Sequence, residues 1–436
     1  MFFLRSPRAY SVAFASVLLA LTACGPAVSE KGPERNTVQN NTAPMRPIEG
    51  IDAVPPELEE TTGGKTGPTG GVMATPAPAP GTPVKTTVRV HYPNAAQITL
   101  QTGTGKIMLR GSEAPLSWTQ SMTGAAQGDL ATFEVDAPYG TTIEFKPVIE
   151  QGSPIWSIGA NYKVAAGATR EVYPHFFNGL GKVVTLFPAF HSTLIGNNRN
   201  ITAYLPPSYD ENTSATYPVL YMHDGQNLFD GGQAFGGNEW KVDETLNDGI
   251  YTGSLREIIV IGIANTSDRM SEYTPTKDAS YGGGEGDEYL TFIRDELMPA
   301  VQNALRVQTG REATGLLGSS LGGLISAYAG VHYGQTFGIV GAMSPSTWWN
   351  KKFLIGDVKA NPQTGNKRPL RVYVDSGDAG PSNDDVTNTA TLAQTYKAQG
   401  FVEGQDFHYV VGSKHEHNEY YWAQRLPNAL KFLFPE

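Results

Sequence analysis

One serine in this sequence lies in a pattern that is typical of nucleophilic catalysis. Gly318, Ser320 and Gly322 form G-x-S-x-G, in which the serine sits on a strained turn between a strand and a helix. A short apolar segment, TGLLG, precedes this pattern, and a helical segment, LGGLISAYAGVHY, follows it. Around Ser319 the corresponding positions are leucines. The pattern therefore predicts Ser320, rather than Ser319, as a nucleophile.

A serine nucleophile needs a base that takes its proton. His332 lies about three turns along the helix after Ser320, and His408 lies in an apolar strand, so neither is expected to reach the hydroxyl. The polar loop SKHEH contains His415 and His417 and follows the last predicted strand, where hydrolase folds place their base. The residues themselves leave both histidines open.

A third group must orient that base. The segment RVYVDSGDAGPSNDDVTNT predicts a strand followed by a loop with Asp378, Asp384 and Asp385. Each of these carboxylates is a candidate, and the spacing leaves all three open. The backbone N–H of Leu321, directly after the serine, is the expected donor to a developing oxyanion.

A metal site is the alternative use of the two loop histidines. His415 and His417 form a His-x-His pair that His223 or Asp224 would have to complete. No third ligand lies at a diagnostic spacing, and such a site would leave the serine motif unexplained. We therefore expect no metal and no organic cofactor.

These groups require a scaffold of alternating strands and helices over residues 178–436. YPVLYMHDG and REIIVIGIAN are continuous apolar runs, as in strands covered on both faces, while DEYLTFIRDELMPAVQNAL has one apolar helical stripe. The alternation predicts a mostly parallel sheet that binds ligands beyond the carboxyl ends of its strands. Four further strands are expected at Thr314–Gly318, Phe337–Met343, Leu370–Asp375 and His408–Val411.

Residues 85–177 have a different texture. TVRVHY, TFEV and TIEF alternate apolar and polar residues between turn signals, which predicts a small all-β sandwich. Trp118, Trp156 and Tyr162 are expected to lie mainly in its core, with a sugar-stacking surface as the alternative. WSIGANY resembles a starch-binding type of module, and the resemblance implies a carbohydrate-binding-like domain.

The first 84 residues are expected to direct the chain out of the cytoplasm and to anchor it to a membrane. Residues 1–24 have a basic start, a short apolar run and LTAC, which resembles the lipobox of bacterial lipoproteins. The resemblance implies lipidation of Cys24 and a membrane anchor in the cell envelope, with Gly25 favouring the outer membrane. Residues 25–84 are rich in Pro, Gly and Thr and predict a disordered linker.

Composition excludes several classes of function. The chain has 32 Lys plus Arg against 42 Asp plus Glu, a net charge of -10, so nucleic acid is not an expected partner. Its one cysteine excludes an intrachain disulfide and a cysteine zinc site.

Motifs across 178–436 resemble one family. AYLPPSYD, YPVLYMHDGQNLFD, VIGIANTSDRMSEYTP, GLLGSSLGGLISAYAG, MSPSTWW and HNEYYWAQRLPNALKFLF are similar to the enterochelin esterase and carbohydrate esterase (feruloyl or acetyl-xylan type) group of α/β-hydrolases. The resemblance implies an α/β-hydrolase fold, nucleophile Ser320, and His417 as base, because His417, Glu419 and Trp422 match the H-x-E-x-x-W segment of the family.

The resemblance also ranks the acids and adds an oxyanion donor. The family position for the acid, three residues after a glycine, is Gly380 here, so the sequence departs from the pattern. A lengthened loop favours Asp384, then Asp385, then Asp378. Gln226, after HDG, is implied as the second oxyanion donor.

Other family positions concern the substrate and the turns. Asn265, Arg269 and Tyr273 match a rim motif and are substrate-binding candidates by resemblance. His223 and Asp224 are expected to pin a turn. The loop YGGGEGDEY, residues 281–289, lacks the Lys and Ser/Thr of a phosphate loop and predicts a mobile rim. Trp348 and Trp349 are expected either to line an acyl pocket or to lie in the core. We take Trp348 as the candidate for substrate binding.

These observations predict a surface-tethered serine esterase that acts through an acyl-enzyme on polysaccharide-linked feruloyl or acetyl groups or on siderophore esters. The first alternative is a non-catalytic carbohydrate- or siderophore-binding lipoprotein. The second is a metal-dependent hydrolase that uses His415 and His417.

Overall fold

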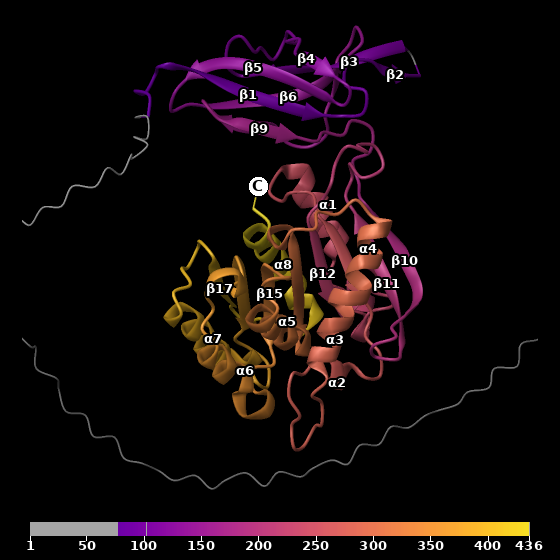
Figure 1. Cartoon of the computed structure of the whole chain (residues 1–436), viewed down its shortest axis with the longest axis vertical. Coiled ribbons are helices and arrows are strands. Elements are labelled where there is room, and N and C mark those ends of the chain that lie inside the picture. The colour runs from indigo at the N-terminus through magenta and orange to yellow at the C-terminus, as the bar shows by residue number, and fades with distance from the viewer. Residues whose placement is uncertain (1–76, 102, 436) are drawn as a thin grey trace, which may run out of the picture. The chain divides into compact units, whose positions relative to one another are not determined.

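The computed structural model describes residues 77–101 and 103–435 (Figure 1). These residues belong to one compact unit, Thr75–Glu436. The expected signal segment 1–24, its Cys24 and most of the expected linker 25–84 lie outside the described residues.

Two antiparallel-rich sheets form the first part of the described chain. One sheet has the strand order β4-β5-β1-β9, and the other has the order β2-β3-β6-β7 with β8 paired to β6. Alternate residues of β5 are buried, as expected for strands with one face in a core. The strands are β1 (Pro83–His91), β2 (Ile98–Leu100), β3 (Gly103–Gly111), β4 (Ala125–Gln127), β5 (Leu130–Pro138), β6 (Thr142–Glu150), β7 (Ile155–Trp156), β8 (Tyr162–Ala165) and β9 (Thr169–Val172).

The aromatic residues of this region differ from our expectation of core positions. Trp118 and Trp156 are 36% and 37% exposed, and their ring centroids lie 6.3 Å apart. Tyr162 is partly buried and stacks on Phe145. The core expectation is therefore wrong for the two tryptophans, because smaller residues such as Phe133 and Val135 fill the space between the sheets.

A second region contains an eight-stranded sheet of order β10-β11-β13-β12-β14-β15-β16-β17. The six strands β12 to β17 run parallel to one another. β10 and β11 extend the sheet at one edge by antiparallel pairing. This mostly parallel sheet is the predicted α/β-hydrolase arrangement. Its strands are β10 (Lys182–His191), β11 (Asn198–Leu205), β12 (Val219–His223), β13 (Ile259–Ile263), β14 (Thr314–Ser320), β15 (Ile339–Pro345), β16 (Arg371–Gly377) and β17 (Phe407–Gly412).

Helices cover both faces of this sheet (Figure 1). Residues of α3 to α7 share one buried cluster, and residues of α1 and α8 share the other. A π-helical turn, Ile293–Leu297, joins α3 to α4, so the predicted helix is continuous. The helices are α1 (Val242–Thr252), α2 (Arg269–Glu272), α3 (Gly286–Phe292), α4 (Met298–Ala304), α5 (Leu321–His332), α6 (Trp349–Ala360), α7 (Val386–Ala398) and α8 (Glu419–Leu433), with short 3-10 turns at Gly225–Asn227, Phe235–Gly237, Arg311–Ala313, Gly365–Lys367 and Asn383–Asp385.

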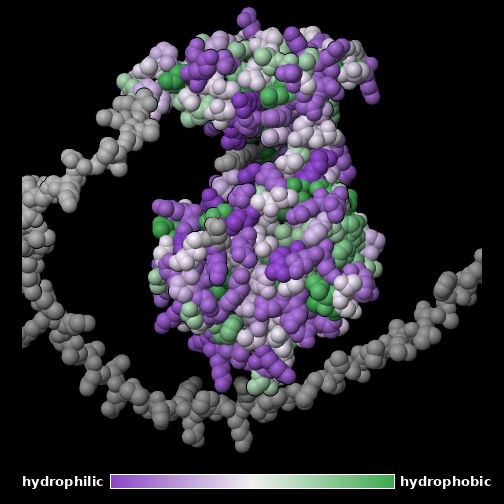
Figure 2. Space-filling model, viewed as in Figure 1, coloured by the Kyte–Doolittle hydropathy of each residue, from purple (hydrophilic) through white to green (hydrophobic). Residues whose placement is uncertain are grey.

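The surface is mostly polar. Figure 2 shows hydrophilic residues over most of the visible face, with smaller hydrophobic patches between them. Among the described residues, the helices are all too short or too polar to cross a bilayer.

A buried ion pair fastens α2 to β11. Arg199 Nη1 and Nη2 donate to the two carboxylate oxygens of Glu272 at 3.1 and 2.5 Å, and both side chains are almost fully buried. The guanidinium also lies over the rings of Tyr289 and Phe292. Because α2 starts at Arg269, this pair fixes the helix that carries one of the predicted site residues.

We expect Glu272→Leu to lower the free energy of unfolding by about 3–5 kcal/mol, because it leaves the charge of Arg199 buried and unpaired. The double variant Arg199→Met with Glu272→Leu is expected to regain much of that loss. Chemical denaturation followed by circular dichroism measures both. Glu144→Gln, which breaks the exposed pair with Lys163, is the control, with an expected change below ~1 kcal/mol. Equal losses in the single and double variants would contradict this account.

Candidate active site

Ser320 occupies a strained turn between β14 and α5. Its backbone φ of 57° and ψ of -122° lie outside the regions that L residues prefer. The turn fits only because glycines surround it: a Cβ on Gly318 would lie 2.7 Å from the ring of His223, and one on Gly323 would lie 2.8 Å from the carbonyl oxygen of Met343. Ser319 is buried. The structure thus places the predicted nucleophile, partly exposed, at the carboxyl edge of the sheet.

His417 and Asp384 meet at the same edge. His417 Nδ1 lies 2.5 Å from Asp384 Oδ1, the carboxylate is fully buried, and the imidazole is 38% exposed. The ring of Trp422 packs edge-on against the imidazole, with 5.1 Å between centroids. Strand pairing between β14 and β15 brings Ser320 opposite Pro345, next to the residues that hold Asp384.

Asp384 is ionised at neutral pH. Burial alone would raise its pKa, but hydrogen bonds from His417, the hydroxyl of Ser344 and the backbone N–H of Gly377 lower the pKa below its usual value. The residue sits in a left-handed turn, with φ of 47° between two neighbours of similar φ. This turn points its carboxylate inward.

The other two candidate acids have different partners. Asp385 accepts from the hydroxyl of Thr347 and, at 2.6 Å, from the amide of Asn388. Asp378 accepts from the backbone N–H of Lys414 at 2.5 Å. Of the three carboxylates, Asp384 contacts His417. Asp378 and Asp385 instead accept hydrogen bonds from neighbouring loop and helix residues.

The hydroxyl of Ser344 is the hub behind Asp384. It donates to Asp384 Oδ2 at 2.5 Å, and it accepts from Trp422 Nε1 at 3.0 Å and from Arg425 Nη2 at 2.8 Å. A hydroxyl has one donor and two acceptor sites, so all of its capacity is in use. Ser344 has a φ of 39° and is buried at the end of β15.

Arg425 is held in turn by Asp375. Arg425 Nε and Nη2 donate to the two carboxylate oxygens of Asp375 at 2.9 and 3.2 Å, with both side chains buried. Sequence reasoning missed Ser344, Asp375 and Arg425. One signal was present: Arg425 lies three residues after Trp422 in α8, and a charge on the buried stripe of a helix needs a partner.

A second turn, at the end of β12, carries Gln226. Asp224 accepts from Asn265 Nδ2 at 2.6 Å and from Arg269 Nε and Nη2 at 2.7 and 2.9 Å. Gln226 Oε1 accepts from the backbone N–H of Asn265 at 3.1 Å. Asn265 and Arg269 are predicted to bind substrate. In the structure their side-chain N–H groups donate to Asp224 and so hold the turn.

His223 and Tyr273 complete the support of this turn. Burial lowers the pKa of His223 to about 3, so its ring is neutral, and Nδ1 lies 2.9 Å from the hydroxyl of Tyr289. Tyr273 is buried and accepts from the N–H of Asp224 at 3.1 Å. These contacts agree with the expected pinning of the turn.

Glu419 links the two halves of the site. Its Oε1 accepts from Asn227 Nδ2 at 3.2 Å, and Asn227 belongs to the same short turn as Gln226. Glu419 is also the first residue of α8, two residues after His417. The start of α8 is therefore tied to the turn beside β12.

The two neighbouring tryptophans separate in the structure. Trp348 is 44% exposed, whereas Trp349 is fully buried and donates from Nε1 to the carbonyl of Thr276 at 2.9 Å. Trp349 is thus a core residue, and Trp348 is available at the surface of this edge.

The remaining histidines of the second half have structural partners. His332 lies 2.9 Å from Asp357 Oδ2, and His408 lies 2.8 Å from Glu403 Oε1. His415 lies 3.2 Å from Arg425. In the part of the chain that the structure describes, no three His, Cys, Asp or Glu side chains are grouped to hold a metal ion.

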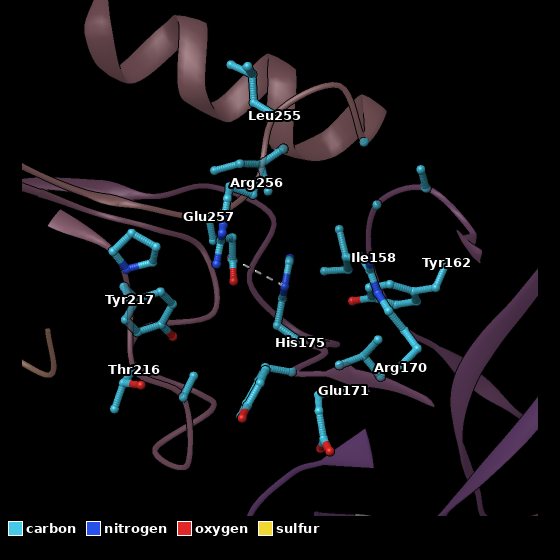
Figure 3. Close-up of a pocket in the computed structure, with 18 of the residues that line it drawn as sticks. Ile158, Tyr162, Arg170, Glu171, His175, Thr216, Tyr217, Leu255, Arg256 and Glu257 are labelled. Carbon is cyan, nitrogen blue, oxygen red and sulfur yellow. Dashed lines mark ion pairs between the residues drawn. The ribbon is translucent and has the colours of Figure 1, made fainter. Parts of the chain in front are cut away.

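A cavity of about 400 Å³ lies elsewhere, at the amino edge of the sheet (Figure 3). Tyr217 and Glu257, which precede β12 and β13, line it together with His175 and Tyr162. His175 Nδ1 lies 3.9 Å from Glu257 Oε1. Figure 3 shows the two side chains facing each other. Burial lowers the pKa of His175 to about 4, so its imidazole is neutral at pH 7. This cavity is separate from the edge that carries Ser320.

Comparison with known proteins gives a family. The family model described as "Putative esterase" matches residues 192–433, more than half of the chain. The uncharacterized protein YbbA of Bacillus subtilis is 31% identical over 251 residues, which cover 54% of this chain and 93% of YbbA. The siderophore triacetylfusarinine C esterase of Aspergillus fumigatus is 32% identical over 155 residues, which cover 34% of this chain and 50% of that protein.

Among solved structures, an IroE-like serine hydrolase from Shewanella oneidensis superposes with a TM-score of 0.45 and 20% identity, covering 58% of this chain and 80% of that one. The family model spans the segment from the residue after β10 to the end of α8, which includes every residue of the candidate site. The chain therefore belongs to the esterase family that this model describes, and its motifs resemble the enterochelin esterase and carbohydrate esterase group of α/β-hydrolases.

Proposed function

We propose that this chain is a serine esterase that hydrolyses carboxylic esters through an acyl-enzyme, with Ser320 as nucleophile, His417 as base and Asp384 as the orienting acid. The observation that carries the proposal is the 2.5 Å hydrogen bond between His417 and the buried Asp384, at the edge where a strained turn presents Ser320. Membership of the esterase family supports ester hydrolysis as the reaction.

The contacts of Asp384 select the useful tautomer of His417. An ionised carboxylate only accepts hydrogen bonds, so the proton resides on Nδ1 and Nε2 is left as an acceptor. Ser320 Oγ lies 3.4 Å from Ser346 Oγ, and in the proposed reaction it turns from Ser346 to Nε2. Catalytic hydrogen bonds of this kind tighten when substrate binds.

The reaction then proceeds in two halves. Ser320 Oγ attacks the carbonyl carbon while its proton passes to His417, and the departing alcohol takes that proton as its C–O bond breaks. Water attacks the acyl-enzyme, gives a proton to His417, and releases the carboxylic acid as Ser320 regains its proton. These reaction steps require no metal and no organic cofactor.

Two backbone N–H groups are the proposed oxyanion donors. Leu321 is the first residue of α5, so its N–H points out of a helix N-terminus. Gln226 lies at the end of β12, and its side-chain oxygen is held by Asn265, which fixes the turn. Each such donor is worth about 3–4 kcal/mol of barrier.

The substrate is proposed to be a polysaccharide-linked feruloyl or acetyl ester or a siderophore ester. A relative whose name is siderophore triacetylfusarinine C esterase supports the second class. We also propose a lipid anchor at Cys24 that holds the enzyme at the outer membrane, supported by the lipobox-like LTAC.

We expect a fluorophosphonate probe to label the wild-type protein and to leave Ser320→Ala unlabelled, because the probe reacts only with an activated serine. Ser319→Ala is the matched control, since Ser319 is adjacent but buried, and it should still be labelled. Gel fluorescence measures the labelling.

Labelling that survives Ser320→Ala would refute the assignment of the nucleophile. A wild-type protein that neither reacts with the probe nor hydrolyses any ester would favour a binding protein. Activity that a chelator abolishes and Ser320→Ala spares would favour a metal centre on His415 and His417.

Asp384→Asn is expected to lower kcat by roughly 10³- to 10⁴-fold, because an amide no longer enforces the tautomer of His417. Asp385→Asn is the control and should change kcat only a few-fold, since Asp385 contacts Thr347 and Asn388. Steady-state kinetics on one soluble ester, with a thermal melt to verify folding, tests both. Equal losses in the two variants would count against Asp384.

A second function is proposed for the β-sandwich, namely binding of carbohydrate. Trp118 and Trp156 are both exposed, with rings tilted by 36°, and Arg110 lies 5.1 Å from the ring of Trp156. Arg110 is fixed by Ser121 at 2.8 Å and Glu150 at 3.3 Å. Exposed indole faces beside fixed polar groups suit the apolar face and hydroxyls of a sugar ring.

The double variant Trp118→Ala with Trp156→Ala is expected to lose at least ~10-fold in affinity for an insoluble polysaccharide, because both stacking surfaces disappear. Co-sedimentation with granular starch, xylan and cellulose measures binding. Phe177→Ala, which removes another exposed aromatic ring, should bind as the wild type does. Absence of binding to all three polymers by the wild type would rule out this second function.

A further inference from the structure

Two large aromatic side chains lie exposed against each other at the catalytic edge. Trp348 is 44% exposed and Tyr281 is 59% exposed. Their ring centroids are 5.6 Å apart, with an angle of 71° between the planes. Large aromatic residues are usually mostly buried, so an exposed pair of this kind is a feature that packing does not explain.

Trp348 belongs to the turn that touches the nucleophile. The N–H of Ser346 donates to the carbonyl of Ser320 at 2.9 Å, and the hydroxyls of the two serines are 3.4 Å apart. The N–H of Trp349 donates to the carbonyl of Ser346 at 3.1 Å and closes the turn. Trp348 is therefore positioned by a segment in direct contact with Ser320.

Tyr281 is presented by a short, tied loop. Asp278 and Gly282 form a two-way backbone bridge, with N–H to carbonyl distances of 2.7 and 3.0 Å. The carboxylate of Asp278 also accepts from the N–H groups of Ser280 and Tyr281 at 2.7 and 3.2 Å. The sequence predicts a mobile rim over residues 281–289, and in the structure these hydrogen bonds close the turn that carries Tyr281.

The buried side chain of Trp349 contacts both the loop of Tyr281 and the turn of Trp348. Its buried ring contacts Tyr281 at a centroid distance of 6.1 Å and Trp348 at 5.7 Å. Gly283 has a φ of +82°, and a Cβ on it would lie 2.9 Å from the ring of Trp349 and 2.2 Å from the hydroxyl of Thr274. Only glycine permits the loop to pass this close, so the pair is formed before any substrate arrives.

We propose that Tyr281 and Trp348 form an aromatic clamp that selects esters carrying a planar aromatic ring. The inference rests on the proposed esterase function of Ser320. A ring of the substrate stacks on the exposed face of one aromatic side chain and meets the edge of the other, an arrangement that aromatic groups prefer. An acetyl group offers no such surface, so the clamp favours aromatic over acetyl esters.

Three ethyl or butyrate esters test the clamp: ethyl butyrate without a ring, ethyl ferulate with a ring on the acyl side, and phenyl butyrate with a ring on the alcohol side. Trp348→Ala and Tyr281→Ala are each expected to reduce the kcat/KM of at least one ring-bearing ester, relative to ethyl butyrate, by about 3- to 10-fold. The change should lie mainly in KM, because the clamp binds the ring before and during reaction.

Two further variants sharpen the test. Trp348→Phe keeps an aromatic face and should retain most of the preference. Tyr251→Ala removes an aromatic residue that is 63% exposed in α1, outside the clamp, and should leave the preference as in the wild type.

Clamp and esterase fail in different ways. Preferences that stay unchanged in both alanine variants, while ethyl butyrate is hydrolysed and Ser320 is labelled by the fluorophosphonate probe, would overturn the clamp alone. A wild-type protein that shows neither labelling nor hydrolysis would overturn the esterase proposal first. Loss of preference in Trp348→Phe equal to that in Trp348→Ala would also contradict stacking.

Discussion

The arrangement of the site depends on the hydroxyl of Ser344. It makes one donated and two accepted hydrogen bonds, to Asp384, Trp422 and Arg425, and so joins β15, the loop after β16 and α8 at one atom. In this buried setting Trp422 Nε1 would otherwise lose its hydrogen-bond partner, at a cost of about 1–3 kcal/mol. The orientation of His417 follows, because the imidazole rests on Asp384 and on the ring of Trp422.

Backbone strain gathers around this hub. Positive φ values occur at the ends of β14 and β15, directly after β12, in the first turn of α6 and in the short turn before α7; the residues are Ser320, Ser344, Asp224, Asn350–Lys352 and Asn383–Asp385. Each such non-glycine residue costs roughly 1–2 kcal/mol. The parallel sheet and its two buried helical layers offset that cost, so that sharp turns can aim polar groups at one place.

Local patterns were sufficient to predict the scaffold and to select Ser320 as the candidate nucleophile. The strands that carry Ser320 and the apolar helix stripes are short-range signals, and glycine spacing alone separates Ser320 from Ser319. The proposed partners are long-range: Asp384 and His417 are 33 residues apart, and the family resemblance places the acid at Gly380, before the lengthened loop that carries Asp384. For His417 the family resemblance was needed, because spacing left His415 equally open.

Other features escaped because burial cannot be read from residue type. Ser344 looks like any strand-end serine until Arg425 and Trp422 converge on it. Trp118 and Trp156 were expected in a core that smaller side chains fill instead. Trp348 and Trp349 are adjacent and identical in type, yet one is exposed and the other buried, a difference that only the turn at the end of β15 decides.

The imidazole of His417 is partly open to solvent, whereas its partner Asp384 is buried. Its ring is 38% exposed, while the carboxylate behind it is sealed. Bulk solvent therefore reaches part of the imidazole in this structure. In the proposed mechanism, water can therefore approach the imidazole during each turnover, while the carboxylate that orients it stays out of solvent.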